Sequence, residues 1–186
     1  MSYYDVLLFL HIGAATIWLG SGFFLQMLIL RAERSDDREL TRGIASNSGW
    51  LAQRIFIPAS LAVLILGVLL TIEGPWSFGD LWVVLGLAGY AVSFLVGILV
   101  IEPQGKRIHA AMAAGEEARA AGLIRRINAV SRIELVVLYL VVGAMVLKPT
   151  GDDTGTLIVG AALLLVALAY WAPKLRLPAL AATATD

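Results

Sequence analysis

The chain has no cysteine and few charged residues, and these two shortages already exclude several kinds of protein. Without cysteine it cannot form a disulfide, a zinc–thiolate site, an iron–sulfur cluster or a thiol nucleophile. Charged residues make up 15% of its 186 residues, whereas a soluble domain carries about a quarter. These charges are too few to cover the surface of a compact soluble fold. The composition therefore excludes an ordinary soluble enzyme and a disordered chain.

The charges that are present balance, with 14 Lys and Arg against 14 Asp and Glu. No basic field is available to attract a phosphate backbone, so nucleic acid is excluded as a partner. Apolar residues dominate instead: they make up 59% of the chain, and the mean hydropathy is +0.83. These values predict a small membrane protein whose immediate partners are membrane lipids.

Long apolar runs give the predicted number of membrane crossings. A helix rises about 1.5 Å per residue, so about 20 apolar residues cross the hydrocarbon core of a bilayer. We expect an all-α integral membrane protein in which four transmembrane helices form a bundle and a fifth lies alongside, within a single domain over residues 1–176. The five runs that meet or approach the required length cover residues 6–30, 51–72, 81–101, 133–147 and 156–172.

Prolines and charges set the expected ends of these spans. Glu102-Pro103 should stop the third span and Pro173-Lys174 the fifth, because proline interrupts the hydrogen bonding of a helix. Residues 177–186 are expected to form a loose cytoplasmic tail. The first span has 25 residues without a charge, which exceeds the apolar region of about 7–15 residues in a cleaved signal peptide.

The basic residues predict the orientation of the chain. Thirteen of the 14 Lys and Arg residues fall on one side of the predicted spans. Because basic residues favour the cytoplasmic side, the N-terminus is predicted to lie outside and the C-terminus in the cytoplasm. The two charged loops, residues 31–54 and 106–132, are expected to form solvated helices that lie on the surface. The first loop should extend the first helix before the chain turns, and the second has candidate breaks at Gly115 and Gly122.

Three polar residues lie near the predicted cytoplasmic ends of the spans: Gln26, Arg54 and Glu134. Polar groups inside a bilayer are costly, which makes each of them a candidate for a functional site. Near the end of a span, however, a long side chain can reach water. The simplest interpretation is therefore either such snorkelling or an Arg54–Glu134 ion pair that ties the second helix to the fourth.

A single histidine lies within the predicted spans. His11 is about 7–10 Å into the first helix, at about 1.5 Å per residue, and helical spacing puts Ala14, Ala15 and Trp18 on its face. One interpretation is that the small side chains admit a flat macrocycle whose iron His11 ligates, with Trp18 as a wall. The other is that they let a second helix pack closely, with His11 making a hydrogen bond across that interface.

A haem site needs a partner for His11 at the same depth, and the fourth predicted helix offers two. Met145 would complete a His/Met pair on iron, and Lys148 would ligate as a neutral amine or pair with a propionate. The alternatives are core or lipid packing for Met145 and snorkelling to the outer surface for Lys148. The other histidine, His109, is expected in a cytoplasmic loop, too far away to share a metal with His11. Copper and zinc need clustered ligands, which the sequence lacks.

Two segments resemble the HemJ-type protoporphyrinogen oxidases. Residues 7–33, LLFLHIGAATIWLGSGFFLQMLILRAE, look like the first helix of that family, with its His, its Trp-x-Gly and its Arg-Ala-Glu-like end. Residues 125–149, RRINAVSRIELVVLYLVVGAMVLKP, are similar to its fourth helix, and Asn128 and Lys148 match the pattern. Ala129 stands where the family has an acidic residue. Copper-resistance proteins of the CopD-like type and uncharacterised bacterial membrane proteins share this outline.

The resemblance implies a function and a location. It implies haem b in a small helix bundle of a bacterial cytoplasmic membrane, with His11 as the axial and metal-binding ligand. It also marks Trp18, Arg31 and Lys148 as functional positions. The oxidases of this family remove electrons from protoporphyrinogen IX and pass them towards the respiratory chain. A porphyrin and components of the respiratory chain are therefore the implied partners.

Two functions from different classes remain open. The first is a haem-b-binding membrane redox protein, with porphyrinogen oxidation as its concrete activity. The second is a cofactor-free accessory or assembly subunit, in a homo-oligomer or a larger membrane complex, whose small-residue helix faces form contact surfaces. A small-solute permease is not expected, because the sequence shows no continuous polar path across the spans.

Overall fold

The computed structural model describes residues 2–175, and the tail expected over residues 177–186 lies outside this part of the chain. Every regular element in the described part is a helix. Two short π-helical segments, η1 and η2, interrupt otherwise continuous α-helices. In chain order the elements are α1 (Tyr3–Ser35), α2 (Arg38–Leu51), η1 (Ala52–Phe56), α3 (Ile57–Glu73), α4 (Leu81–Val96), η2 (Gly97–Ile101), α5 (Glu102–Ala113), α6 (Glu117–Leu147) and α7 (Thr154–Leu175).

Five helical stretches in the described part are long and apolar enough to cross a membrane. They are α1, the stretch from α2 through η1 to α3, the stretch from α4 through η2 to α5, α6, and α7. This arrangement confirms the predicted all-α fold with five spans. The helices extend beyond the apolar runs: α6, for example, begins at Glu117, 16 residues before the predicted span at 133–147.

Polar residues fix the starts of the first two helices. At the start of α1, the Ser2 hydroxyl accepts a hydrogen bond from the backbone N–H of Asp5 (3.1 Å), and the Asp5 carboxylate accepts one from the N–H of Ser2 (2.8 Å). The Asp37 carboxylate accepts from the N–H of Leu40 at the start of α2 (2.9 Å). Such caps satisfy the N–H groups that the first turn of a helix leaves free.

Pro103 does not stop the third span, contrary to the sequence prediction. α4 passes through η2 into α5, whose second residue is Pro103. The second span has the same design, since η1 lies directly before Ile57 and Pro58. Proline lacks an N–H, and its ring collides with the carbonyl one turn earlier. A π turn is wider than an α turn and makes room for the ring. Pro173 also lies inside α7 and does not end it.

The two charged loops form helices, as predicted, and these helices extend the spans. α2 leads directly into the second span, and α5 continues the third before the chain turns back into α6. Gly115 makes this turn with a φ of +72°, which glycine adopts without steric cost. The predicted break at Gly115 is therefore confirmed, whereas Gly122 lies inside α6 and breaks nothing. The alanine-rich sequence favours helix, and here it prolongs the existing ones.

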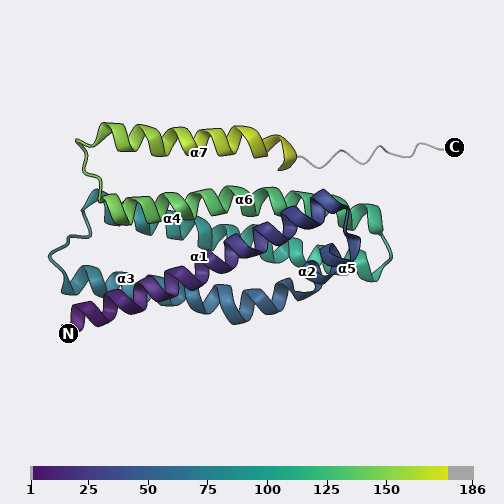
Figure 1. Ribbon diagram of the computed structural model, residues 1–186, viewed down its shortest axis with the longest axis horizontal. Coiled ribbons are helices and arrows are strands. Elements are labelled where there is room, and N and C mark those ends of the chain that lie inside the picture. Colours follow the sequence, from purple (N-terminus) through teal and green to yellow (C-terminus); the bar gives the residue numbers. More distant parts are fainter. Residues whose placement is uncertain (1, 176–186) are drawn as a thin grey trace.

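The four long helical stretches from α1 to α6 lie side by side, and α7 runs along the outside of the bundle (Figure 1). α1 packs mainly on α3, α4 packs mainly on α6, and α6 also carries α7. α3 and α4 follow each other in the chain but touch little, whereas α1 makes further contacts with α6. The four-helix bundle predicted from the sequence is thus built from two helix pairs, α1–α3 and α4–α6, with the fifth span alongside.

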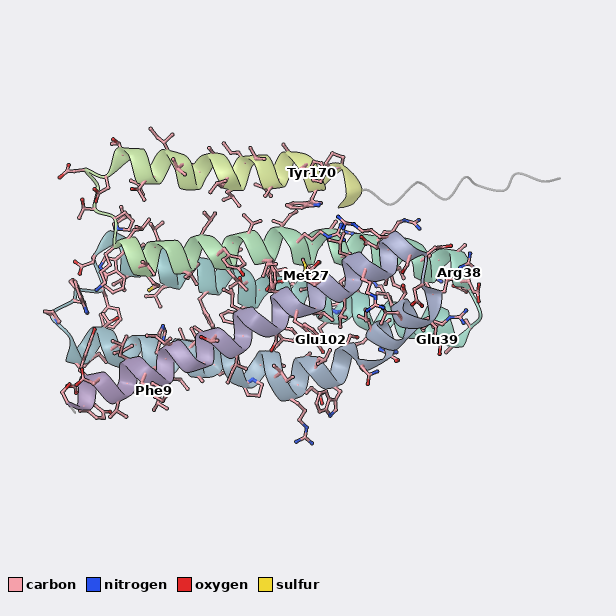
Figure 2. The ribbon with its side chains drawn as sticks, in the orientation of Figure 1. Phe9, Met27, Arg38, Glu39, Glu102 and Tyr170 are labelled. Carbon is pink, nitrogen blue, oxygen red and sulfur yellow. The ribbon has the colours of Figure 1, made fainter. Side chains whose placement is uncertain are left out.

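The two ends of the bundle differ in character. At one end α1 turns into α2 and α5 turns into α6; we call it the charged end, and Figure 2 shows Arg38 and Glu39 there. The opposite end holds the α3–α4 turn with Trp76 and the start of α4 with Trp82, and we call it the aromatic end. Large apolar side chains such as Phe9, which is 74% exposed, lie on the outside between the ends, as a lipid-facing surface requires.

Candidate functional site

The candidate residues His11, Ala14, Ala15 and Trp18 lie on one face of α1, which is turned into the bundle. All four are half-buried. Spacings of three, four and seven residues keep them on one side of the helix. The same face continues to Gln26, which is 7% exposed. Any site built around His11 therefore lies between α1 and the other bundle helices and not on the lipid-facing surface.

His11 lies against α3. A Cβ placed on Gly67 of α3 would be 3.2 Å from Cε1 and 3.6 Å from Nδ1 of His11, so a larger residue there would displace the ring. Nδ1 is enclosed and makes no hydrogen bond with the described residues. The backbone of Val63, one turn before Gly67, lies near the imidazole, outside the geometry of a hydrogen bond to Nδ1. The close helix contact expected by the packing interpretation is therefore present, with the Val63 backbone beside the ring.

Trp18 connects the two helix pairs. Its ring meets the ring of Tyr90 on α4 edge to face, with 5.9 Å between the centroids, and Tyr90 stacks on Phe94 at 6.0 Å. The Tyr90 hydroxyl is enclosed and has no hydrogen-bond partner in the described part of the chain. This contact lies two helical turns from His11 towards the charged end. We call the part of the bundle between the Trp18–Tyr90 contact and the charged end the charged half. The part between this contact and the aromatic end is the aromatic half.

Met145 and Lys148 each have a partner other than His11. Met145 lies on Gly86 of α4, where a Cβ would overlap the terminal methyl of Met145. Lys148 follows α6 in the left-handed conformation, with a φ of +46°. Its Nζ is 3.7 Å from the ring centroid of Trp76 and 5.2 Å from that of Trp82. These cation–π contacts hold the ammonium group at the aromatic end.

Arg31 lies far from His11. Near Arg31, it is Glu33 that connects α1 to α6. Arg31 is exposed and 20 residues from His11, which is about 30 Å along α1 at about 1.5 Å per residue. The two residues therefore cannot contact one porphyrin. Glu33 accepts a hydrogen bond from the Asn128 amide at 3.0 Å and forms an ion pair with Arg132 at 2.5 Å. This cluster joins the two segments that carry the family resemblance.

Sequence reasoning missed Glu33 and Arg132 as partners, although a signal for Glu33 was present. Glu33 follows Gln26 by seven residues and therefore extends the inward face of α1. The predicted Arg54–Glu134 pair is wrong. Arg54 is exposed, and no ion pair joins it to Glu134 among the described residues.

The rotation of α6 explains why that pair does not form. Glu134 lies seven and eleven residues before Val141 and Met145, whose side chains lie on glycines of α4. Residues with this spacing share one face of a helix. Glu134 is therefore on the side of α6 that packs on the third span, where α6 contacts η2. Arg54 belongs to the second span, on another side of the bundle.

A bare metal ion has no cluster of ligands in the part of the chain that the structure describes. No group of three or more His, Cys, Asp or Glu that could hold one occurs there. A haem iron needs only an axial residue from the protein, because the porphyrin supplies the other four nitrogens. The single histidine within the bundle thus supplies the number of donors that an axial haem ligand requires.

Comparison with known proteins gives one finding. A family model described as "Predicted integral membrane protein (DUF2269)" matches residues 5–149. The match covers more than half of the chain and runs from α1 to the end of α6, so it includes the four bundle helices. No curated protein and no solved structure matches the chain.

Proposed function

We propose, for a chain that belongs to the DUF2269 family of predicted integral membrane proteins, that it binds haem b within the membrane and transfers electrons. His11 would be the axial ligand. The observation that carries the proposal is the enclosed Nδ1 of His11, which has no hydrogen-bond partner among the described residues. A buried polar group without a partner costs about 1–3 kcal/mol. A ligand that fixes the ring would remove part of this cost.

The surroundings of His11 fit the role of an axial ligand. Histidines that bind metals commonly give one nitrogen to the metal and donate the N–H of the other to a backbone carbonyl. The Val63 backbone, which lies near the imidazole, can accept such a bond from Nδ1 and so leave Nε2 for iron. Ala14 and Ala15 present little bulk beside the ring. A flat group approaching α1 there displaces few side-chain atoms.

Haem supplies one-electron transfer when bound, and the protein residues position and shield it. His11 would fix the iron, while Trp18 and Tyr90 would exclude water from the side of the charged half. Met145 is the proposed sixth ligand, because its flexible side chain can turn away from α4. Lys148 is the proposed partner of a propionate, which would replace one of its aromatic contacts. Arg31 is left out of this site because of its distance along α1.

The resemblance to HemJ-type oxidases extends the proposal to a substrate and a direction. A porphyrinogen would give electrons to the haem, and a respiratory-chain component in the same bacterial cytoplasmic membrane would take them. The contact of Glu33 with Asn128 supports this extension, because it brings together the two segments in which the resemblance lies.

An absorption spectrum tests the proposal. Protein purified in detergent from cells that make haem should show a Soret band, and His11→Ala should abolish it. His109→Ala is the matched control, since His109 is exposed on α5 and should leave the band unchanged. Colourless wild-type protein after haem has been supplied would contradict the proposal. So would a band that persists in His11→Ala.

A second candidate function is that of a cofactor-free accessory subunit of a membrane complex. The observation that favours it is α2, in which no residue is buried and Trp50 is 60% exposed. A helix with a free face suits contact with another protein. Gentle extraction followed by native sizing separates the two functions: a stable partner without a chromophore supports the accessory role, and a coloured protein without a partner supports the haem role.

A further inference from the structure

Six side-chain polar atoms in the described part are enclosed without a hydrogen-bond partner. Three of them belong to residues that are at least nine-tenths buried: Gln26 (7% exposed), Ser93 (3%) and Gln104 (4%). Such groups are costly as long as no water reaches them. The six atoms are Nδ1 of His11, Oε1 of Gln26, the hydroxyl of Tyr90, Oγ of Ser93, Oε1 of Gln104 and Nε of Arg126.

Five of these six atoms lie in the charged half or at its border. Ser93 is one turn beyond Tyr90 along α4, and Gln104 follows on α5. On α1, Gln26 is eight residues beyond Trp18, which is about 12 Å at about 1.5 Å per residue. α1, α4 and α5 all contact α6, which carries the remaining atom. The unpaired groups therefore form a series along the bundle and do not gather at one depth.

Ser93 differs from the other buried hydroxyls. Ser60 donates its hydrogen bond to the carbonyl of Ile57, and Thr71 donates to the carbonyl of Gly67, each at 3.0 Å. A buried hydroxyl without another partner commonly bonds its own helix in this way. Ser93 makes no such bond. Its position leaves the hydroxyl ready for a partner that is not part of the chain.

The series has a polar entrance at the charged end. The Glu33 side chain is 38% exposed and accepts a hydrogen bond from Asn128, which is 7% exposed. A carboxylate that solvent can reach is thus connected to a buried amide.

The aromatic half shows the opposite character. Its buried residues include Leu7 (4% exposed), Leu70 (8%) and Val83 (4%). Trp76 and Lys148 are in cation–π contact at its end. Among the described residues, the enclosed polar atoms without partners therefore concentrate in the charged half, and Nδ1 of His11 is the one that lies in the aromatic half.

We propose that the charged half of the bundle binds a file of exchangeable water molecules that enters beside Glu33 and ends at Tyr90. Water both donates and accepts, and a buried water typically makes about three hydrogen bonds to groups that lack partners. The amide oxygens of the two buried glutamines need hydrogen-bond donors. The hydroxyls of Ser93 and Tyr90 can both donate and accept a hydrogen bond. Such a file lets protons reach the middle of the bundle by hops, in which each water passes one proton on as it takes another. It does not rest on haem binding.

Radiolytic labelling tests this proposal. An X-ray pulse converts bound water into hydroxyl radicals, which oxidise the side chains they touch, and mass spectrometry locates the added oxygen. Tyr90 in the folded protein in detergent should be oxidised although it lies inside the bundle. Mixing with H₂¹⁸O shortly before the pulse should place ¹⁸O on Tyr90, because the water file exchanges with the bulk.

Variants on two different helices keep the test decisive. Ser93→Ala and Gln26→Leu should each lower the oxidation of Tyr90 several-fold, with folding checked by circular dichroism. Thr71→Val is the matched control, because its hydroxyl is satisfied by its own helix and it lies in the aromatic half. His11→Ala should leave the labelling unchanged, which separates this result from haem binding. Tyr90 that stays unoxidised in the folded wild type, or takes up no ¹⁸O, would overturn the proposal.

Discussion

The aromatic half and the charged half of the bundle are held together in different ways. In the aromatic half, Met145 and Val141 of α6 fill the space left by two glycines of α4. In the charged half, Glu33 of α1 meets the amide of Asn128 on α6. Lipid provides no hydrophobic force between helices, so close packing has to drive their association there. Near water, polar contacts can take this role, and the depth of a contact therefore decides which interaction joins the helices.

The largest effect is expected from overfilling the aromatic half. A Cβ on Gly89 would overlap Cγ2 of Val141, and a valine in a helix has one strongly preferred rotamer and cannot turn aside. Gly89→Val should therefore lower the free energy of unfolding by about 3 kcal/mol. Unfolding by SDS in mixed micelles, followed by circular dichroism, measures the change.

Two other glycines provide controls for this comparison. Gly143→Ala on α6 should leave the stability unchanged or raise it slightly, because no atom lies within 4 Å of the added Cβ. Gly86→Ala should cost less than Gly89→Ala, since Met145 can swing its terminal methyl away. Equal losses at Gly86 and Gly89 would contradict the importance of side-chain stiffness at this interface.

The next effect is expected in the charged half. Glu33→Ala leaves the buried amide of Asn128 without its acceptor, and this should lower the free energy of unfolding by about 2 kcal/mol. Glu33→Gln still offers Asn128 an oxygen but loses the ion pair with Arg132. It should therefore cost less than Glu33→Ala in the same SDS titration. Equal costs would mean that the ion pair, and not the amide contact, joins α1 to α6.

The sequence predicts the number of spans because the thickness of the bilayer fixes what a span requires. It does not predict where these helices end beyond the lipid, because an apolar run carries no information there. Pro103 indicates a stop only if the helix keeps α geometry, and η2 supplies a wider turn directly before it. The continuation of the spans into α2 and α5 is not predicted for a similar reason. The charged sequence alone does not distinguish a helix that lies on a membrane from one that leaves it.

The inward face of α1 is predictable, since periodicity alone puts His11 and Trp18 on one side of the helix. Contacts between helices are not, because they depend on how each helix is rotated in the bundle. Glu134 is on the side of α6 that packs on the third span, and it therefore does not pair with Arg54. Met145 lies on α4 for the same reason. A one-residue change in phase, about 100°, is enough to exchange such partners.

A smaller effect is expected at the aromatic end. Lys148→Ala removes the cation–π contacts with Trp76 and Trp82, which should lower the free energy of unfolding by about 1 kcal/mol. Lys148→Arg should keep most of this contribution, because a guanidinium also binds aromatic faces. Lys148→Gly should cost less than Lys148→Ala, since glycine adopts the positive φ without strain. Tryptophan fluorescence should change in the Ala and Gly variants and not in the Arg variant.

The smallest effect is expected for the ion pair between Arg42 and Glu117 at the charged end. Its atoms are 2.6 Å apart, but the side chains are 60% and 67% exposed. Water and salt screen such a pair, so Arg42→Ala should change the free energy of unfolding by less than about 0.5 kcal/mol. The Arg132–Glu33 pair is more enclosed, at 21% and 38%, and Glu33 also binds a buried amide. If Arg42→Ala costs as much as Glu33→Ala, and the cost disappears at high salt, surface charge and not the buried contact joins the helices at this end.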